Sequence, residues 1–192
     1  MNPSGKLKMA LPTTQPFWRF LYLAGMKNVF VLFVLVLTAT TAFAKPSADS
    51  IPGHLKNLRL PDFKLLLSDS STNFYTENLK PNRYTILISF SPECDHCKQQ
   101  TKEITEQIGR FKNAQIVMST TLPFGMMKDF YAEYKIASHK NITMGRDVLY
   151  FFPKYFRNHY LPLIAVYNKK GELIHYADGG MPTAELIRLV SE

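Results

Sequence analysis

The chain has only two cysteines, Cys94 and Cys97, and two residues separate them. A buried strand is predicted over residues 84–90, and the Ser-Pro-Glu sequence that follows ends it just before the first cysteine. A helical pattern begins there, so one thiol is expected at a helix N-terminus, where unpaired backbone N–H groups stabilise a thiolate. A thiolate attacks a disulfide, and a second cysteine one turn later can resolve the mixed disulfide. The motif is therefore typical of a thiol–disulfide exchange site.

Three residues next to the thiols are expected to tune this chemistry: Glu93, Asp95 and His96. Positive charge on His96 favours a thiolate at Cys94, whereas the two flanking carboxylates oppose a further negative charge. A stabilised thiolate stabilises the reduced form and makes the disulfide a stronger oxidant. Because two carboxylates oppose one imidazole, the pattern favours an intermediate potential and a role as a reductase or isomerase.

Residues 26–44 contain the three parts of a secretory signal peptide. A basic start at Met26 and Lys27 precedes the apolar run Val29–Leu37, and Ala42-Phe43-Ala44 forms a cleavage site. We therefore predict a leader and signal peptide over residues 1–44, with translation starting at Met26 and export to the periplasm or cell envelope. The alternative is an uncleaved signal that anchors the protein, although the run is shorter than the ~20 residues of a spanning helix.

The 148 residues that remain after cleavage are enough for one domain. The full chain carries a charge of +8, which falls to about +4 without the leader, too little to indicate nucleic acid as a partner. The cysteine pair closes too short a loop to stabilise an exported protein, which favours a reactive pair over a structural one. We predict a monomer with no organic cofactor and no metal.

The predicted elements alternate between strands and helices. Residues 45–57 are interpreted as a flexible lead-in because they begin with many Ser, Pro and Asp residues, and the domain is expected over residues 58–192. The helix after Cys94 carries apolar or small residues at steps of four and three, which indicates one buried face. The expected strands and helices together predict an α/β three-layer sandwich with a mixed central sheet flanked by helices. These elements are strands at 63–67, 73–76, 84–90 and 115–119, helices at 123–136 and 148–158, a hairpin of 163–167 with 172–176, and a last helix at 182–190.

From about Leu58 onwards, the chain resembles the thioredoxin superfamily, and within it the exported TlpA/ResA-like branch of thiol–disulfide oxidoreductases. The resemblance depends on three segments in order: Leu60-Pro61-Asp62-Phe63, the run from Phe90 to Cys97, and Leu161-Pro162-Leu163-Ile164 followed by Gly171. It implies a thioredoxin-like fold and a redox-active disulfide between Cys94 and Cys97. It also implies protein disulfide or dithiol substrates and a membrane-borne electron donor.

The resemblance assigns the wall of the substrate groove to Leu161 and Pro162, with a cis peptide bond between them. Three positions differ from the family pattern. Glu93 stands where members usually have Trp, Ile88 stands where thioredoxins have a buried Asp, and Gln100 stands where the TlpA/ResA-like branch often has Glu. The usual proton acceptor for Cys97 is therefore not at either expected position. Glu103 lies almost two turns further along the helix, and Glu93 or a water is the expected substitute.

Three alternatives stay open. A peroxiredoxin-type peroxidase shares the fold, but its cysteine normally follows a Pro-x-x-x-Thr/Ser sequence that this chain lacks. A thioredoxin-like binding or scaffolding module would hold the cysteines in a static disulfide. A metal carrier would need further ligands, because one Cys-x-x-Cys pair supplies too few. The histidines outside the motif lie far apart with no ligand spacing; they are His54, His139, His159 and His175.

Overall fold

The computed structural model describes residues 51–191, and the predicted leader, its cleavage site and residues 45–50 lie outside that range. A seven-stranded sheet with the order β2-β1-β5-β4-β3-β6-β7 forms the centre of the domain. β3, β4 and β5 run parallel to one another, and every other neighbouring pair is antiparallel. The sheet is therefore mixed, as predicted. Its strands are β1 (Lys64–Leu67), β2 (Asn73–Tyr75), β3 (Tyr84–Ser89), β4 (Ala114–Thr120), β5 (Ile142–Arg146), β6 (Leu163–Tyr167) and β7 (Leu173–Asp178).

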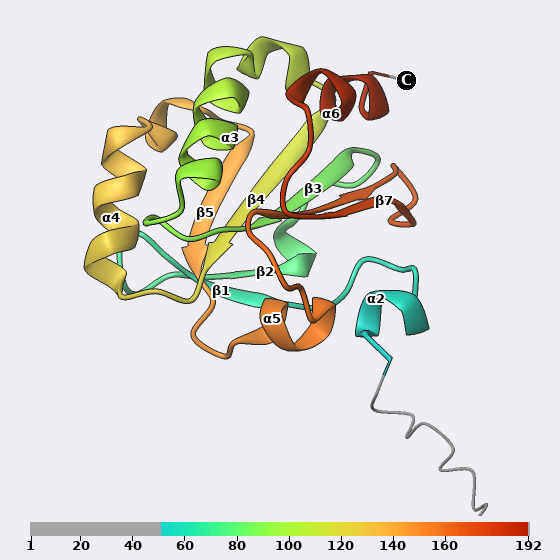
Figure 1. The fold of residues 1–192 in the computed structure, drawn as a ribbon, viewed down its shortest axis with the longest axis horizontal. Helices are drawn as coiled ribbons and strands as arrows, with labels where there is room; N and C mark the ends of the chain where they lie inside the picture. The colour runs from blue at the N-terminus through green and yellow to red at the C-terminus, as the bar shows by residue number, and fades with distance from the viewer. Residues whose placement is uncertain (1–50, 192) are drawn as a thin grey trace, which may run out of the picture. The chain divides into compact units, whose positions relative to one another are not determined.

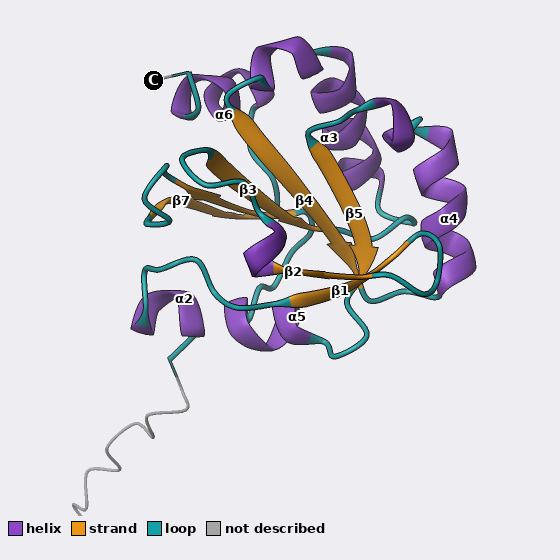
Figure 2. Ribbon diagram, turned by 180° about the vertical axis from the view of Figure 1, so that it is seen from behind, coloured by secondary structure: helices purple, strands orange, loops and turns teal. Residues whose placement is uncertain are grey.

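Helices cover both faces of the sheet, which confirms the predicted three-layer α/β sandwich (Figures 1 and 2). One face carries α3 (Asp95–Glu106), α4 (Phe124–Glu133) and α6 (Thr183–Leu189), and the other carries α2 (Gly53–Lys56) and α5 (Phe151–Phe156). Side chains alternate across each strand, so Ile86 and Ile88 pack toward α3, whereas Leu87 packs toward α5. Short 3₁₀ turns lie at Thr76–Asn78, Ile108–Phe111 and Ile136–Ser138.

The strand–turn–helix unit that carries the cysteines forms as the sequence predicts. All six residues of β3 are buried, because the strand lies between β4 and β6 and is covered on both faces. Cys97, Thr101 and Ile104 of the predicted helical face are buried in α3, together with Gln100, which was not predicted there. The helix ends at Glu106, so the apolar residues Ile108 and Phe111 lie in the 3₁₀ turn that follows. The hairpin of β6 and β7 is confirmed as well, with Gly171 in the turn at a φ of 73°.

Two elements differ from the sequence prediction. The strand β5 was not predicted, because Ile-Thr-Met-Gly-Arg shows only two apolar residues in alternation and contains a glycine. Gly145 is required there, since a Cβ atom would lie 2.8 Å from Cβ of Leu65 on the neighbouring strand. The helix predicted over residues 148–158 is limited to Phe151–Phe156, because Tyr150 and Arg157 adopt left-handed backbone conformations at its two ends.

Part of the expected lead-in is helical and packs on the domain. In α2, His54 is buried and its ring stacks on Tyr176, with 4.2 Å between the ring centroids. Gly53 lies so close to the ring of Tyr155 that a Cβ atom would be 2.3 Å from it. Residues 53–56 therefore belong to the packed domain. Within residues 51–191, no helix is long and apolar enough to span a membrane.

Candidate active site

Cys94 is the N-cap residue of α3, as the sequence predicted. Its sulfur accepts a hydrogen bond from the backbone N–H of Cys97, with 3.3 Å between the two atoms. The Cys94 sulfur is thus the acceptor for one of the N–H groups that the first helical turn leaves unpaired. The side chain is partly exposed, and both cysteines are free thiols. Such a sulfur can carry negative charge and can also reach a substrate.

Cys97 lies one turn further along α3 and is 1% exposed. It packs in the core between α3 and the sheet, among apolar side chains. Burial raises the pKa of Cys97 to about 12, and the neighbouring Cys94 thiol adds to this effect. Cys97 therefore stays protonated at neutral pH while Cys94 is the accessible sulfur.

The peptide bond between Leu161 and Pro162 is cis, as the sequence analysis predicted. This bond lies beside the first cysteine, because the Cys94 thiol points to the backbone oxygen of Leu161 at 3.7 Å. Gly180 packs against the Pro162 ring. Its φ is 88°, and a Cβ atom there would lie 3.4 Å from that ring. The cysteine segment and the cis-proline loop, whose contacting residues are 67 positions apart in sequence, thus meet at Cys94.

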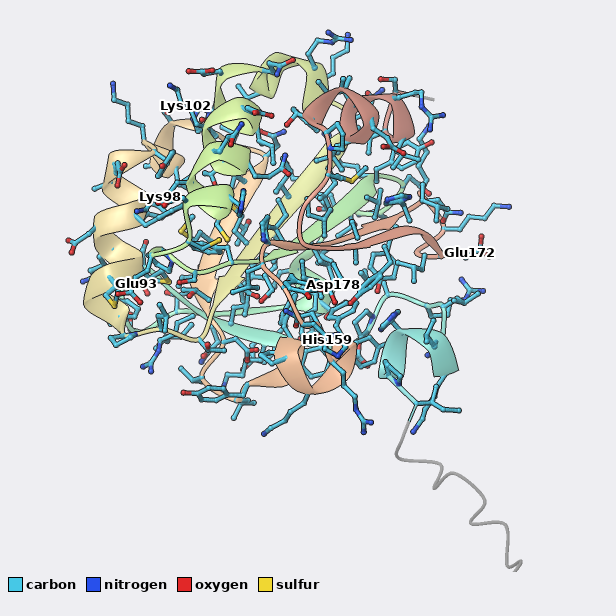
Figure 3. The ribbon with its side chains drawn as sticks, in the orientation of Figure 1. Glu93, Lys98, Lys102, His159, Glu172 and Asp178 are labelled. Atoms are coloured by element: carbon cyan, nitrogen blue, oxygen red, sulfur yellow. The ribbon has the colours of Figure 1, made fainter. Side chains whose placement is uncertain are left out.

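A carboxylate that the sequence analysis did not single out holds the loop before the cis-proline. Asp178, at the end of β7, accepts hydrogen bonds from the backbone N–H groups of His159 and Tyr160, both at 2.8 Å. Its side chain also lies 3.3 Å from Nδ1 of His159, and Figure 3 shows the two side chains next to each other. Burial opposes the charge, but these backbone hydrogen bonds outweigh it and lower the pKa of Asp178. The sequence signal is an acid followed by two glycines at a strand end.

Gln100 connects α3 to α6 instead of facing Cys97. Its amide nitrogen donates to the Thr183 hydroxyl at 2.9 Å, and that hydroxyl donates to the Glu103 carboxylate at 2.6 Å. The amide oxygen of Gln100 accepts from the backbone N–H of Met181 at 3.2 Å. The second carboxylate oxygen of Glu103 accepts from Gln99, so both oxygens are occupied away from Cys97. Hydrogen bonds from Thr183 and Gln99 lower the pKa of Glu103.

The three residues predicted to tune the site all lie near it on the surface, but in different settings. Asp95 has a side chain that is 95% exposed and lies 3.4 Å from the ammonium group of Lys98, so its charge is directed to solvent and offset. Glu93 is exposed and lies two residues before α3 (Figure 3). His96 lines a polar cleft of about 200 Å³ with Pro162 and Gly180. Of the three, only His96 faces the cleft next to the cis-proline.

The described part of the chain offers no cluster of three or more His, Cys, Asp or Glu side chains that could hold a metal ion. The four histidines outside the motif are dispersed. Of these, His54 is buried against aromatic rings and His159 borders Asp178.

Solved structures of thioredoxin-like proteins share this fold. A secreted disulfide oxidoreductase of Mycobacterium tuberculosis, described as homologous to E. coli DsbE, gives a TM-score of 0.56 at 19% identity, over 67% of this chain and 94% of that one. A peroxiredoxin-like protein from Aquifex aeolicus gives 0.56 at 14% identity, over 69% and 83%. The reduced 2-Cys peroxiredoxin of Plasmodium vivax gives 0.56 at 14% identity, over 69% and 91%. No family model and no curated protein matches the sequence.

At these identities the likeness concerns the fold alone. The chain therefore has the thioredoxin-like fold that the sequence predicted, with its Cys-x-x-Cys motif at the start of α3.

Proposed function

We propose that the protein is a thiol–disulfide oxidoreductase that reduces disulfides of exported proteins. The observation that carries the proposal is the pairing of a partly exposed Cys94 at a helix N-cap with a buried Cys97 one turn later, next to a cis-proline. In this arrangement the Cys94 sulfur can react with a substrate sulfur, whereas the buried Cys97 sulfur can react only with Cys94.

The reaction proceeds in two exchanges. The Cys94 thiolate attacks one sulfur of the substrate disulfide, which forms a mixed disulfide and releases the other substrate sulfur as a thiolate. Cys97 then loses its proton and attacks the Cys94 sulfur, which releases the second substrate thiolate and leaves a Cys94–Cys97 disulfide. The substrate gains two electrons and the enzyme pair loses two.

The proton of Cys97 must leave before the second exchange, because burial raises the pKa of this thiol to about 12. Glu103 is poorly suited as the acceptor, because hydrogen bonds from Thr183 and Gln99 lower its pKa and make it a weaker base. The substrate thiolate released in the first exchange is a base formed at the site at the required moment. We assign the proton to this leaving thiolate, so that a thiol departs and Cys97 becomes the resolving nucleophile.

The proposed substrates are protein disulfides in the periplasm or cell envelope, approached through the groove beside Leu161 and Pro162. A membrane-borne electron donor would return the Cys94–Cys97 disulfide to the dithiol. The signal-peptide pattern of residues 26–44 supports export. Intact mass of the protein from its host tests this, with a mature N-terminus at Lys45 expected and a chain that retains Val29–Leu37 indicating the anchored form.

Insulin reduction by the wild type, Cys94→Ser and Cys97→Ser proteins tests the activity. We expect turnover only by the wild type and a trapped mixed disulfide at Cys94 in the Cys97→Ser variant. Consumption of hydrogen peroxide without insulin reduction would indicate a peroxidase instead. A Cys94–Cys97 disulfide that dithiol reagents leave intact, with neither activity, would indicate a binding or scaffolding module.

A further inference from the structure

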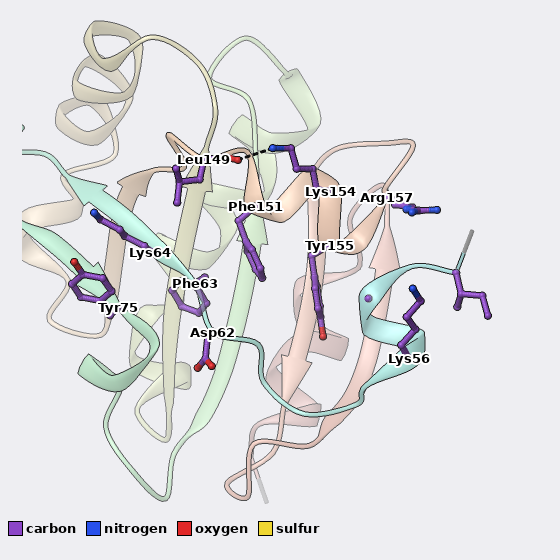
Figure 4. A pocket seen from close by; sticks show the side chains of 12 residues that line it. Lys56, Asp62, Phe63, Lys64, Tyr75, Leu149, Phe151, Lys154, Tyr155 and Arg157 are labelled. Atoms are coloured by element: carbon purple, nitrogen blue, oxygen red, sulfur yellow. Dashed lines mark hydrogen bonds between the residues drawn. The ribbon is translucent and has the colours of Figure 1, made fainter. Parts of the chain in front are cut away.

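A second surface lies on the face of the sheet opposite α3. Residues of α2, β1 and α5 enclose a groove of about 570 Å³ (Figure 4). The core beneath it belongs to the cluster around Phe63 and Phe152, whereas Cys94 and Cys97 belong to the cluster on the other face. The groove is therefore separate from the candidate active site, and an inference about it does not depend on the redox function.

The inside of the groove is aromatic. Phe63 is buried at its base, and Phe151 and Tyr155 stack with 5.2 Å between their ring centroids. The Tyr155 hydroxyl is held by the backbone oxygen of Asn57 at 3.2 Å, which fixes this ring between α5 and the residue after α2. The apolar surface is thus preformed by packed rings.

Apolar side chains extend this surface into solvent. Ile51 and Leu149 border the groove and are 47% and 59% exposed. Leu55 in α2 and Tyr150, which follows Leu149, are exposed as well. Exposed apolar side chains at the border of an aromatic groove indicate an interaction surface, whereas scattered single ones do not.

Cationic side chains surround the aromatic surface. Figure 4 shows Lys64 on one side, Lys154 at another edge, and Lys56 and Arg157 near α2, while Asp62 is the one acid among the lining residues. Lys64 places its ammonium group 5.7 Å from the Tyr75 ring, and that of Lys154 donates to the Leu149 backbone oxygen at 3.1 Å. A partner of complementary chemistry has an apolar body and a negatively charged head.

We propose that this groove and its apolar border form a membrane-docking surface for anionic phospholipids. Lysine and arginine side chains are attracted to an anionic leaflet, and tyrosine rings are favoured at the boundary between headgroups and acyl chains. Docking through α2 and α5 leaves Cys94 on the opposite face of the sheet, open to soluble substrates.

In the anchored alternative, in which the signal is not cleaved, the position of the groove in the chain also favours a lipid partner. Ile51, which borders the groove, follows the apolar run Val29–Leu37 by about 14 residues. A fully extended chain of that length spans at most about 50 Å. If the run is retained in the membrane, as in the anchored form, it keeps the groove near the lipid surface.

A fluorescent probe tests the proposal in the full chain. The two native cysteines are replaced by Ser, and a single new cysteine at Leu149→Cys receives an environment-sensitive label. Ala132→Cys, at an exposed position of α4, provides the control site. We expect a blue shift at position 149 but not at 132 with vesicles of phosphatidylcholine and phosphatidylglycerol, and a much smaller shift with phosphatidylcholine alone. The shift at position 149 should weaken as salt rises.

Charge variants provide the matched comparison. Replacing Lys56, Lys64 and Lys154 with Gln should lower the vesicle affinity reported at position 149 on the order of 100-fold, since each lysine near an anionic surface is worth about 5-fold. Replacing three other lysines with Gln, one in α3, one in α4 and one after the turn that follows α3, removes the same charge and should leave that affinity within about 2-fold of the unmodified chain. The control residues are Lys102, Lys112 and Lys128.

Three results would overturn the proposal. The first is an equal effect of the two triple variants, which would mean that overall charge and not the groove determines binding. The second is an equal shift at positions 149 and 132, which would show that the apolar run alone brings the protein to the vesicles. The third is a shift at position 149 that depends on protein concentration in the absence of lipid, which would identify a second copy of the chain as the occupant.

Discussion

The Cys-x-x-Cys segment and the cis-proline loop meet at the same sulfur, but different kinds of contact hold them. In the cysteine segment, the backbone N–H of Cys94 donates to the oxygen of Ser91 at 3.1 Å, and the Cys97 N–H donates to Cys94. The loop before Pro162 is held by Asp178, a residue of another strand. The nucleophile is thus positioned by neighbours in sequence, and the wall of the groove is positioned from a distance.

This difference separates chemistry from substrate binding. Variants within the cysteine segment should abolish or alter the exchange itself. Variants of the distant residues should leave the thiols reactive and loosen the surface against which a substrate chain lies.

The largest effect is expected from removal of the attacking sulfur. Cys94→Ser should reduce insulin reduction to the uncatalysed background, because a hydroxyl at the N-cap does not attack disulfides at neutral pH. Its unfolding midpoint should stay close to that of the reduced wild type, since Ser also caps a helix N-terminus. Turnover by Cys94→Ser would mean that Cys97 is the nucleophile, which would contradict the burial of that side chain.

Asp178→Ala should have the next largest effect, on substrate binding. The loss of a carboxylate that accepts from His159 and Tyr160 should raise KM several-fold and lower the free energy of unfolding by about 1 kcal/mol. The alkylation rate of Cys94 should change little. Asp129→Ala removes an exposed carboxylate from α4 and provides the control. A fall in kcat with KM unchanged would contradict a positioning role.

The same carboxylate predicts a pH dependence. Because the folded protein lowers the pKa of Asp178, its contribution to stability is present above the ordinary value of ~3.9 and is lost as pH falls through the lower folded value. The difference in unfolding free energy between wild type and Asp178→Asn should therefore shrink at acidic pH. Chemical denaturation of both proteins at several pH values measures it.

Gln100→Glu tests whether the family's usual carboxylate would act here as a base. We expect the variant to be less stable by about 1–2 kcal/mol, because it loses the hydrogen bond to Thr183 and brings a second carboxylate next to Glu103. Resolution of the mixed disulfide should not become faster. Gln100→Met serves as an uncharged comparison. Faster release of substrate from the Glu variant would show that this side chain can reach Cys97.

The smallest effects concern the flanking charges. Glu93→Gln with Asp95→Asn should make the disulfide more oxidising, and His96→Ala should make it more reducing, each by less than about 30 mV because exposed charges are screened. Asp95→Asn alone should contribute least, since Lys98 already offsets its charge. Glutathione redox titration measures these potentials. An opposite sign for either variant would mean that the flanking charges do not determine the potential.

Local patterns explain what could be predicted from the sequence. The apolar run of β3, the helical spacing after Cys94 and the turn before Glu172 each lie within one stretch of chain, and the structure confirms the elements they predict. The cis bond before Pro162 followed from the resemblance to thioredoxins and is confirmed.

Long-range contacts explain what could not be predicted. β5 forms a strand because it pairs with β4 on one side and with β1 on the other. Its own sequence shows only weak alternation of apolar and polar residues. The roles of Asp178 and Gln100 depend on partners 18 to 83 residues away. α5 ends at Tyr150 and Arg157, which adopt left-handed backbone conformations. Neither is a glycine, so the sequence does not indicate these ends.

The central claim is that Cys94 attacks and Cys97 resolves. Alkylation of the fully reduced wild-type protein with a short pulse of iodoacetamide, followed by mass spectrometry of the modified peptides, tests it most directly. The account predicts that the label appears at Cys94 at neutral pH, because Cys97 is 1% exposed and its pKa is raised to about 12. Labelling of Cys97 at an equal or greater rate would contradict it.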